Sequence, residues 1–334
     1  MRTEPFSLSL STPLDTAAGT IDERRGFLVR LDLDGTPGLG EATPLPGWTE
    51  SLDDCEAALR EVDDPETALD GDSFADAPAA RHGVSLAVLD ARARAAGEPL
   101  YRHLGANTRI EEVPVNATVG DGEPKETAEA AADAVNKGFP AVKVKVGARP
   151  LAEDVERFEA VRTRCPDVEL RADANGAWDR ETAERALSAF ADHDVAFVEQ
   201  PLSADELSGH TDLRGGPVGI ALDEGLHEHG IDAVLDAAAA DVIVIKPMAL
   251  GGVDRAADAG RRAIDAGLDV VVTTTIDGAV ARAAAVHLAA ALPGVRASGL
   301  ATRRFLDEDI RENVAPIRSG AAVVPQGKGN IPPS

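Results

Sequence analysis

The hydrophobic pattern of the first hundred or so residues is that of a small mixed domain. Residues 5–11 and 26–33 alternate apolar and polar positions, which predicts two half-buried strands joined by a long Gly- and Thr-rich loop, TAAGTIDERRG. Two segments then carry apolar residues at three- and four-residue spacing, one beginning at Ser51 and one ending at Gly97, and this spacing predicts helices. Residues 1–107 are therefore expected to form an α+β domain.

A different pattern begins at Val113, where short β-branched runs alternate with alanine-rich amphipathic segments. The runs are VPVNATVG, AVKVKVG, VELRADANG, VAFVEQP, VGIALDEG, VIVIKPM, DVVVTTT and VRASGL. Eight expected strands in strict alternation with helices predict a parallel α/β barrel over residues 108–300, with a doubly wound sheet as the alternative. The segment AAVVPQGKGN predicts a strand and a turn, and we expect residues 301–334 to return to the N-terminal domain.

The charge of the chain excludes some classes of partner. Its 58 acidic and 33 basic residues give a formal charge of −25, which argues against binding to nucleic acid or to anionic membranes. The acidic residues are distributed along the whole chain, whereas only six of the basic residues are lysines. This composition indicates a solvated acidic surface in a high-salt cytoplasm. An ordinary acidic protein is the alternative, but it would not explain the scarcity of lysine.

The cysteines and the apolar runs indicate in which cellular compartment the protein is expected. Cys55 and Cys165 form neither a metal-type spacing nor a disulfide framework, which favours a reducing compartment. The N-terminal segment is interrupted by prolines and acidic residues and does not have the apolar core of a signal peptide. No apolar run reaches the roughly 18 residues of a membrane span. We expect a soluble cytoplasmic protein that acts on a small molecule, and the sequence leaves open whether it forms a homo-oligomer.

Charged residues stand at the ends of five consecutive β-branched runs. The active site of a parallel barrel lies at the C-terminal ends of its strands, so these positions are the informative ones. They are separated by 28, 26, 24 and 23 residues, about one βα unit each, and are Lys145, Asp173, Glu199, Asp223 and Lys246. We therefore expect five charged groups at one rim of the barrel.

The three carboxylates of this set would repel one another in a cavity of low dielectric constant unless a cation lay among them. A hard divalent ion fits, and Mg²⁺ is favoured because water and substrate oxygens can complete its coordination, with Mn²⁺ as a substitute. The alternative interpretation is that each acid forms a salt bridge to a helix.

The lysines suggest proton transfer. Lys143 and Lys145 are two residues apart on one expected strand and so point to the same side. Two neighbouring ammonium groups disfavour their charged forms, so the pKa of one could fall far enough for it to act as a base. Lys246 would face them across the cavity, an arrangement that suits proton abstraction next to a carboxylate. The alternative is that all three are structural ion-pair partners, a role for which arginine is better suited.

The motifs KVKVG, RADANGAW, FVEQP, ALDEG and VIKPMALGG resemble, in order and spacing, those of the enolase superfamily and its muconate-lactonizing subgroup. That superfamily combines a lysine or histidine base with Mg²⁺. The resemblance covers the whole chain and implies a (β/α)7β modified TIM barrel with an α+β capping domain. The implied roles are Mg²⁺ ligands for Asp173, Glu199 and Asp223, supporting groups for Asn175 and Glu224, and acid/base catalysis for Lys145 and Lys246, with Lys143 assisting.

The C-terminal stretch, from TTTIDG to ASGLAT, resembles that of o-succinylbenzoate synthases, and it places Thr274, Thr275 and Gly299 at the substrate. The resemblance implies syn-dehydration of 2-succinyl-6-hydroxy-2,4-cyclohexadiene-1-carboxylate to 2-succinylbenzoate in menaquinone biosynthesis. N-acylamino acid racemases, dipeptide epimerases and muconate-type cycloisomerases of the subgroup are the alternatives, and a non-catalytic barrel is a further one. Dipeptide epimerases usually carry an Asp-x-Asp pair where this chain has ASGLAT. Arg24 and Arg25 could serve a dianionic substrate or be solvated.

Overall fold

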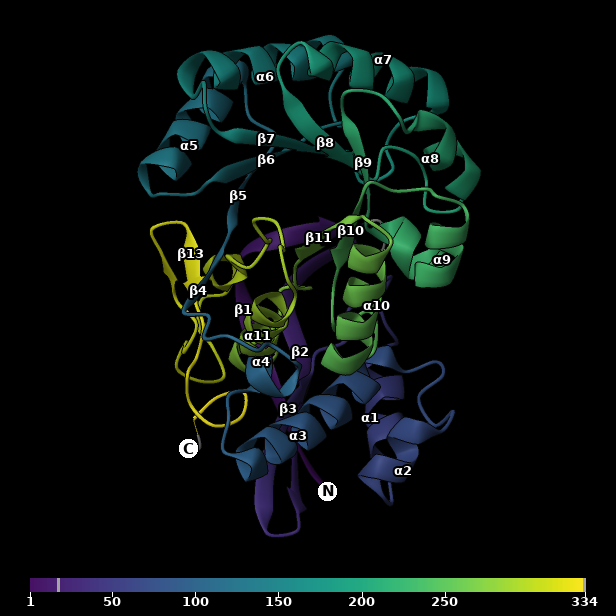
Figure 1. Ribbon diagram of the computed structural model, residues 1–334, viewed down its shortest axis with the longest axis vertical. Helices are drawn as coiled ribbons and strands as arrows, with labels where there is room; N and C mark the ends of the chain where they lie inside the picture. The colour runs from purple at the N-terminus through teal and green to yellow at the C-terminus, as the bar shows by residue number, and fades with distance from the viewer. Residues whose placement is uncertain (17–18, 333–334) are drawn as a thin grey trace.

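The computed structural model describes residues 1–16 and 19–332, and its largest part is a ring of parallel strands with helices outside (Figure 1). Among these residues, seven strands form one sheet in the order β11-β10-β9-β8-β7-β6-β5. They are β5 (Asn116–Val119), β6 (Ala141–Lys145), β7 (Glu169–Asp173), β8 (Val195–Glu199), β9 (Gly219–Leu222), β10 (Val242–Ile245) and β11 (Asp269–Val272). The parallel barrel is confirmed, and the doubly wound alternative is wrong.

A helix follows each of these strands, as the alternating pattern predicted. The helices are α5 (Pro124–Asn136), α6 (Leu151–Arg164), α7 (Arg180–Ala191), α8 (Leu207–Leu213), α9 (Glu224–Asp236), α10 (Val253–Asp265) and α11 (Ala279–Ala291). The buried positions of α5, α7, α10 and α11 are mostly alanine, so these helices can approach the β-branched strands closely.

The predicted eighth strand, VRASGL, is not continuous. It closes the ring through two isolated parallel bridges, Val115 to Ser298 and Thr273 to Gly299. Side-chain bonds add to the backbone pairing here, because the Ser298 hydroxyl accepts from the Val272 N–H and the Thr273 hydroxyl donates to the Gly299 carbonyl. A Cβ atom at position 299 would lie 2.6 Å from Thr273 Oγ1, so this closure requires glycine.

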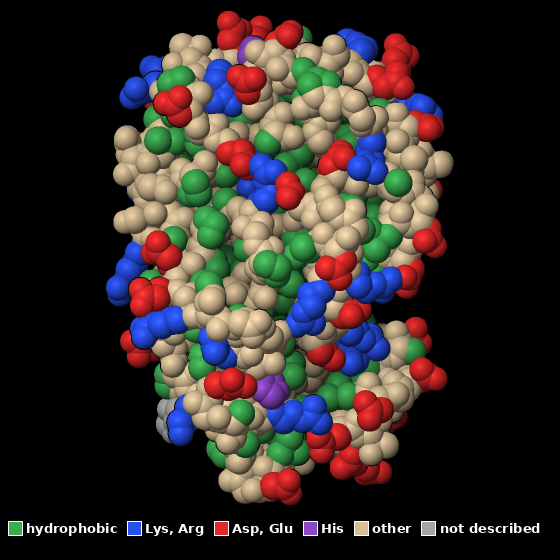
Figure 2. Space-filling view, in the orientation of Figure 1, with side chains coloured by type: hydrophobic (Ala, Val, Ile, Leu, Met, Phe, Trp, Pro, Cys, Tyr) green, Lys and Arg blue, Asp and Glu red, His purple; other side chains and the backbone are tan. Residues whose placement is uncertain are grey.

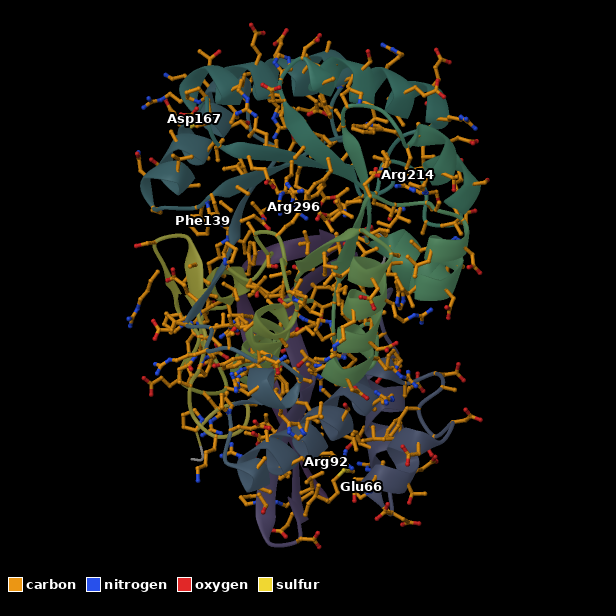
Figure 3. The ribbon with its side chains drawn as sticks, viewed as in Figure 1. Glu66, Arg92, Phe139, Asp167, Arg214 and Arg296 are labelled. Carbon is orange, nitrogen blue, oxygen red and sulfur yellow. The ribbon has the colours of Figure 1, made fainter. Side chains whose placement is uncertain are left out.

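The capping domain contains an antiparallel sheet and three larger helices, which lie below the barrel in Figure 1. Its elements are β1 (Arg2–Thr16), β2 (Gly19–Leu33), β3 (Thr36–Ala42), α1 (Leu52–Arg60), α2 (Pro65–Asp70), α3 (Pro78–Ala96) and the short α4 (Leu100–His103). Strand β3 packs directly on α3, where a Cβ atom at Gly40 would lie 1.9 Å from the Gly83 carbonyl oxygen. Glu66 of α2 pairs with Arg92 of α3 at the outer end of the domain (Figure 3).

The strands of the first hairpin are longer than the sequence predicted. Most of the expected loop TAAGTIDERRG belongs to β2, and residues 17–18 lie outside the described residues. Its polar residues still alternate in and out of the sheet, with Arg24 buried and Arg25 exposed. The pairing of Leu8 with Arg24 extends the ladder through this segment.

The C-terminal tail runs from the barrel to the capping domain. After the short helix η1 (Thr302–Phe305), strands β12 (Ile317–Arg318) and β13 (Ala321–Val323) form a small antiparallel sheet with β4 (Glu112–Pro114). Further along, Gly329 bridges to Pro99, and the Asn330 N–H donates to Asp90 of α3 at 2.6 Å. These contacts agree with the expected return of the tail, and the domain boundaries themselves stay a prediction.

The viewed face in Figure 2 carries interspersed acidic and basic groups with no continuous basic area. Figure 3 labels Phe139, Asp167, Arg214 and Arg296 around the strands, each in a segment that leads into a strand at the N-terminal side of the barrel. Both cysteines are buried and free. Among the described residues, no helix combines the length and the apolar character that crossing a membrane requires.

Candidate active site

The five charged residues of the strand ends meet in one cavity. Lys145, Asp173 and Glu199 are the last residues of β6, β7 and β8, whereas Asp223 and Lys246 directly follow β9 and β10. The parallel register pairs Lys145 with Asp173 and Asp173 with Glu199. All five line a cavity of about 660 Å³ at the C-terminal ends of the strands. The expectation that five successive βα units bring these groups to one rim is confirmed.

Lys143 and Lys145 share this cavity and both contact Asp173. The Lys143 ammonium donates to Asp173 at 2.9 Å and to Glu199 at 2.8 Å, and the Lys145 ammonium donates to Asp173 and to Asn175, both at 2.6 Å. Burial by itself would lower the pKa of Lys143, but the carboxylates of Asp173 and Glu199 raise it overall. The sequence predicted that the pKa of one of the two paired lysines could fall, and Lys143 is not that lysine, because its ammonium group lies between two carboxylates.

Lys246 lies between an acid and an aromatic ring. Its ammonium group forms an ion pair with Asp223, and it lies 3.3 Å from the centroid of the Trp48 ring. Trp48 follows β3 of the capping domain, and its ring also packs on His227 at 5.6 Å. The sequence reasoning missed this tryptophan. The sequence did contain a signal that could have identified it, because Trp48 is one of only two tryptophans in the chain and lies in the loop-forming sequence PLPGWTE.

The cavity is lined by four carboxylates, which include Glu224, and by three lysines. Burial and the neighbouring Asp173 raise the pKa of Glu199 to about 7. Burial also raises the pKa of Asp223, although Lys246 opposes the shift. Burial would raise the pKa of Asp173 too, but Lys143 and Lys145 hold it below its usual range. Such mutual repulsion of buried acids is relieved when a cation binds among them.

Orphaned oxygens indicate where a cation would be accepted. Among the described residues, Oδ1 of Asp223 and Oε2 of Glu224 are buried without a hydrogen-bond partner. Carboxylate oxygens of this kind are the ligands that Mg²⁺ prefers. Within the described part of the chain, no three acidic, histidine or cysteine side chains form a preassembled metal cluster, and the Lys143 ammonium lies between Asp173 and Glu199. The donor set therefore fits a hard divalent ion, whose binding requires the lysines to move off the carboxylates.

The remaining residues that the sequence placed at the site also line the cavity. Thr274, Thr275 and Gly299 lie along its wall after β11 and in the eighth segment. The Thr274 hydroxyl forms a hydrogen bond with that of Thr302 at 2.9 Å, and the Thr275 hydroxyl donates to a neighbouring aspartate. These contacts hold the wall in place.

Asn175 and Glu224 are joined across the site. The Asn175 amide donates to Glu224 at 3.1 Å, while its carbonyl oxygen accepts from Lys145. Asn175 has a positive φ of 45°, a backbone conformation that asparagine tolerates better than most residues. The amide therefore links the lysine of β6 to the carboxylate that follows β9.

Two buried groups of the capping domain fix the loops that form the cavity wall. The carboxylate of Glu41 accepts the N–H groups of Gly278, Val280 and Ala281, and thereby caps the N-terminus of α11. Burial and the nearby Asp277 raise the pKa of Glu41 to about 7. The loop that contains Thr274 and Thr275 is thus held by a residue of another domain.

Arg24 completes this connection. Its guanidinium donates to the carbonyls of Thr43 and Pro44 in one loop and of Ile276 in the other. The side chain is buried and holds loop backbones together, so it differs from the solvated arginine that the sequence allowed. Arg25 is exposed and lies 3.7 Å from Glu23.

Buried acids and lysines at the strand ends of a parallel barrel form a site whose groups can exchange protons, and comparison with known proteins gives the family of the chain. Residues 126–330 match the family described as enolase C-terminal domain-like, and residues 5–91 match the MenC N-terminal domain. The chain belongs to the enolase superfamily, which confirms the resemblance seen in the sequence.

Relatives within the superfamily include both lyases and epimerases. The chain is 31% identical to the L-Ala-D/L-Glu epimerase of Bacillus subtilis, over 87% of this chain and 84% of that one. It is 43% identical to the o-succinylbenzoate synthase of Thermobifida fusca, over 59% of this chain and 62% of that one. A substrate-liganded structure of the Bacillus subtilis epimerase superposes with a TM-score of 0.89 at 27% identity, covering 98% and 96% of the two chains.

A structure of the Enterococcus faecalis dipeptide epimerase, complexed with Mg and the dipeptide L-Leu-L-Tyr, superposes with a TM-score of 0.88 at 26% identity, covering 98% of this chain and 97% of that one. The modified TIM barrel with its capping domain is therefore the architecture of this protein. Mg is bound in that Enterococcus faecalis structure.

Proposed function

We propose that the protein is an o-succinylbenzoate synthase that dehydrates 2-succinyl-6-hydroxy-2,4-cyclohexadiene-1-carboxylate to 2-succinylbenzoate. The observation that carries the proposal is the neutral wall formed after the seventh and eighth strands. The described residues that line the cavity there are Thr273, Thr274, Thr275, Ile276, Gly299, Thr302 and Phe305. None is acidic, so the ammonium group of a dipeptide would find no counter-charge on this wall.

The comparisons add weight to this choice among the activities of the subgroup. The N-terminal match is to the MenC N-terminal domain, and the Thermobifida fusca synthase is 43% identical over the matched region. A synthase from Mycobacterium tuberculosis is 36% identical over 64% of this chain and 65% of that one. We therefore place the reaction in menaquinone biosynthesis, in the cytoplasm of a cell that maintains high internal salt.

In the proposed mechanism, Lys145 is the base. Its side chain is 39% exposed, against 17% for Lys143 and 12% for Lys246, so its amine is the most accessible to a substrate. It removes the proton α to the ring carboxylate and returns a proton to the departing hydroxyl on the same face. One C–H and one C–O bond break, one C=C bond forms, and water leaves.

Lys246 acts as a fixed positive charge on the opposite side. The face of Trp48 stabilises a cation at this position, and a nearby cation lowers the energy of the negative charge that develops on the carboxylate. Lys143 bridges Asp173 and Glu199, and it would move off them when these carboxylates hold the ion. Asp173, Glu199 and Asp223 would hold Mg²⁺, with Asn175 and Glu224 supporting them, and the bound ion supplies Lewis-acid stabilisation of the substrate carboxylate.

The second candidate is an N-acylamino acid racemase, and the placement of Lys145 and Lys246 in one cavity favours it. The N-succinyl-L-Arg/Lys racemase of Bacillus cereus is 31% identical over 64% of this chain and 58% of that one. The test is to incubate the purified protein, in molar KCl with Mg²⁺, separately with the cyclohexadiene substrate and with each enantiomer of N-succinyl amino acids. Rapid dehydration of the cyclohexadiene substrate supports the proposal, whereas solvent deuterium exchange into both enantiomers of N-succinyl amino acids without dehydration supports the racemase.

A further inference from the structure

Arg304 stands out among the cationic groups near the cavity because its guanidinium has no carboxylate partner among the side chains that the structure describes. Lys143, Lys145 and Lys246 are each paired with an acid of the strand ends. Arg303, next in the chain, pairs with Asp309. Arg304 therefore keeps a positive charge that no described side chain neutralises beside a cavity whose other cations are paired.

The surroundings of Arg304 place its charge at the edge of the catalytic cavity. Its guanidinium donates to the carbonyl of Thr118 at 2.9 Å and lies 4.8 Å above the ring of Phe305. Thr118 and Phe305 both line the cavity, as does Thr302 at the start of the same short helix. The guanidinium is therefore held by two residues of the cavity wall and keeps unused N–H donors.

The rest of the wall on this side is neutral, and partial burial lowers the pKa of the Arg304 guanidinium without any described acid to oppose the shift. Arg24, another arginine near the wall, donates to three backbone carbonyls and serves to join two loops. Arg304 is thus the arginine that can meet an anionic group of a ligand with its planar fork of donors.

We propose that Arg304 binds the distal carboxylate of a dicarboxylate substrate whose first carboxylate is held at the strand-end acids and their cation. The inference rests on the proposed function for the identity of that substrate, since its succinyl arm ends in a carboxylate. N-succinyl amino acids carry the same distal group, whereas a substrate with an ammonium group at this end would be repelled by Arg304.

Binding of the reaction product tests the inference without requiring turnover. The affinities of 2-succinylbenzoate and of 2-butyrylbenzoate, which has the same arm length without the distal carboxylate, are measured by titration calorimetry with Mg²⁺ at constant high salt. Arg304→Gln is expected to weaken binding of the dicarboxylate on the order of ten- to a hundredfold and to leave the monocarboxylate unchanged. Arg304→Lys keeps the charge but not the planar pair of donors, so its affinity for the dicarboxylate should lie between those of the wild type and of Arg304→Gln.

Arg318→Gln is the matched control, because Arg318 is exposed on β12 and carries the same charge. It should bind both ligands like the wild type. If Arg304→Gln weakens binding of both ligands equally, or does not weaken binding of the dicarboxylate, the inference is overturned even if dehydration is observed. A wild type that prefers the dicarboxylate through Arg304 but does not dehydrate the cyclohexadiene supports the inference and overturns the proposed function instead.

Discussion

The ammonium group of Lys246 lies 3.3 Å from the centroid of the Trp48 ring, so a residue of the capping domain covers a lysine of the barrel. The lysine comes from the end of β10, while the tryptophan belongs to the loop after β3. The site is therefore complete only when the two domains are packed together. Arg24 and Glu41 also join the two domains, through the loop that precedes α11.

Replacement of Trp48 tests the contribution of this contact. Trp48→Leu keeps an apolar side chain but removes the aromatic face, which is worth about 0.5–2 kcal/mol for a cation above it. If the contact stabilises the transition state, kcat/KM for dehydration should fall about two- to thirtyfold. Trp48→Phe retains a ring and should lose less. Equal activity of the leucine variant and the wild type would show that the contact does not contribute to catalysis.

Removal of a proposed metal ligand should separate folding from metal binding. Asp223→Asn keeps the shape of the side chain, but it removes one of the buried negative charges that attract the ion. We expect Mg²⁺ at a hundred times its Kd to stabilise the wild type by about 2.7 kcal/mol and the variant much less. The shift in melting temperature on addition of Mg²⁺ measures this difference. Turnover that survives exhaustive chelation would contradict the metal assignment.

Burial of His287 is expected to make the folded protein less stable at acidic pH. The His287 side chain is buried in α11, where it accepts the Tyr101 N–H and contacts the carbonyl of Asn330. Burial lowers its pKa to about 4. The unfolded chain therefore takes up a proton near pH 6.5 while the folded chain does so only near pH 4. Stability is lost as the pH falls through this window, by roughly 3 kcal/mol in total.

The measurement compares the free energy of unfolding of the wild type and of His287→Gln between pH 7 and pH 5. The glutamine can keep one acceptor and one donor but does not titrate. Its stability should decrease less on acidification than that of the wild type. An identical decrease in both proteins would show that His287 does not contribute to the acid sensitivity.

The formal charge of −25 predicts dependence on salt. Repulsion among surface carboxylates is weakened when the Debye length shortens to about 3 Å at 1 M ionic strength. The melting temperature should therefore rise as KCl increases from dilute buffer to molar concentration. A melting temperature that does not change over this range would remove the argument for a high-salt cytoplasm.

The charged residues at the strand ends could be predicted from the sequence, because the end of each strand is marked by the local pattern of apolar and polar residues. In a parallel barrel, the last residues of consecutive strands lie at the same rim. The spacing of Lys145, Asp173 and Glu199 was therefore sufficient to predict that they lie side by side. The eighth segment was predicted as a continuous strand, but it pairs with its neighbours only through two isolated bridges.

The residues that reach the cavity from other parts of the chain were not predicted. Trp48 arrives from the capping domain and Phe305 from the segment after the barrel, and both positions depend on tertiary packing that no local period encodes. The lysine contacts were missed for a different reason. Lys143 and Lys145 each pair with acids of neighbouring strands, so the predicted repulsion between the two ammonium groups is outweighed.

The different roles of the two facing lysines are the central claim, and the activities of two arginine variants test it most directly. Arginine keeps the charge but cannot accept a proton at neutral pH. With the cyclohexadiene substrate, Lys145→Arg should lose about a hundred- to ten-thousandfold in kcat, because the base is gone. Lys246→Arg should retain measurable dehydration, because only a positive charge is needed there. A Lys145→Arg variant nearly as active as the wild type would contradict the assignment of Lys145 as the base.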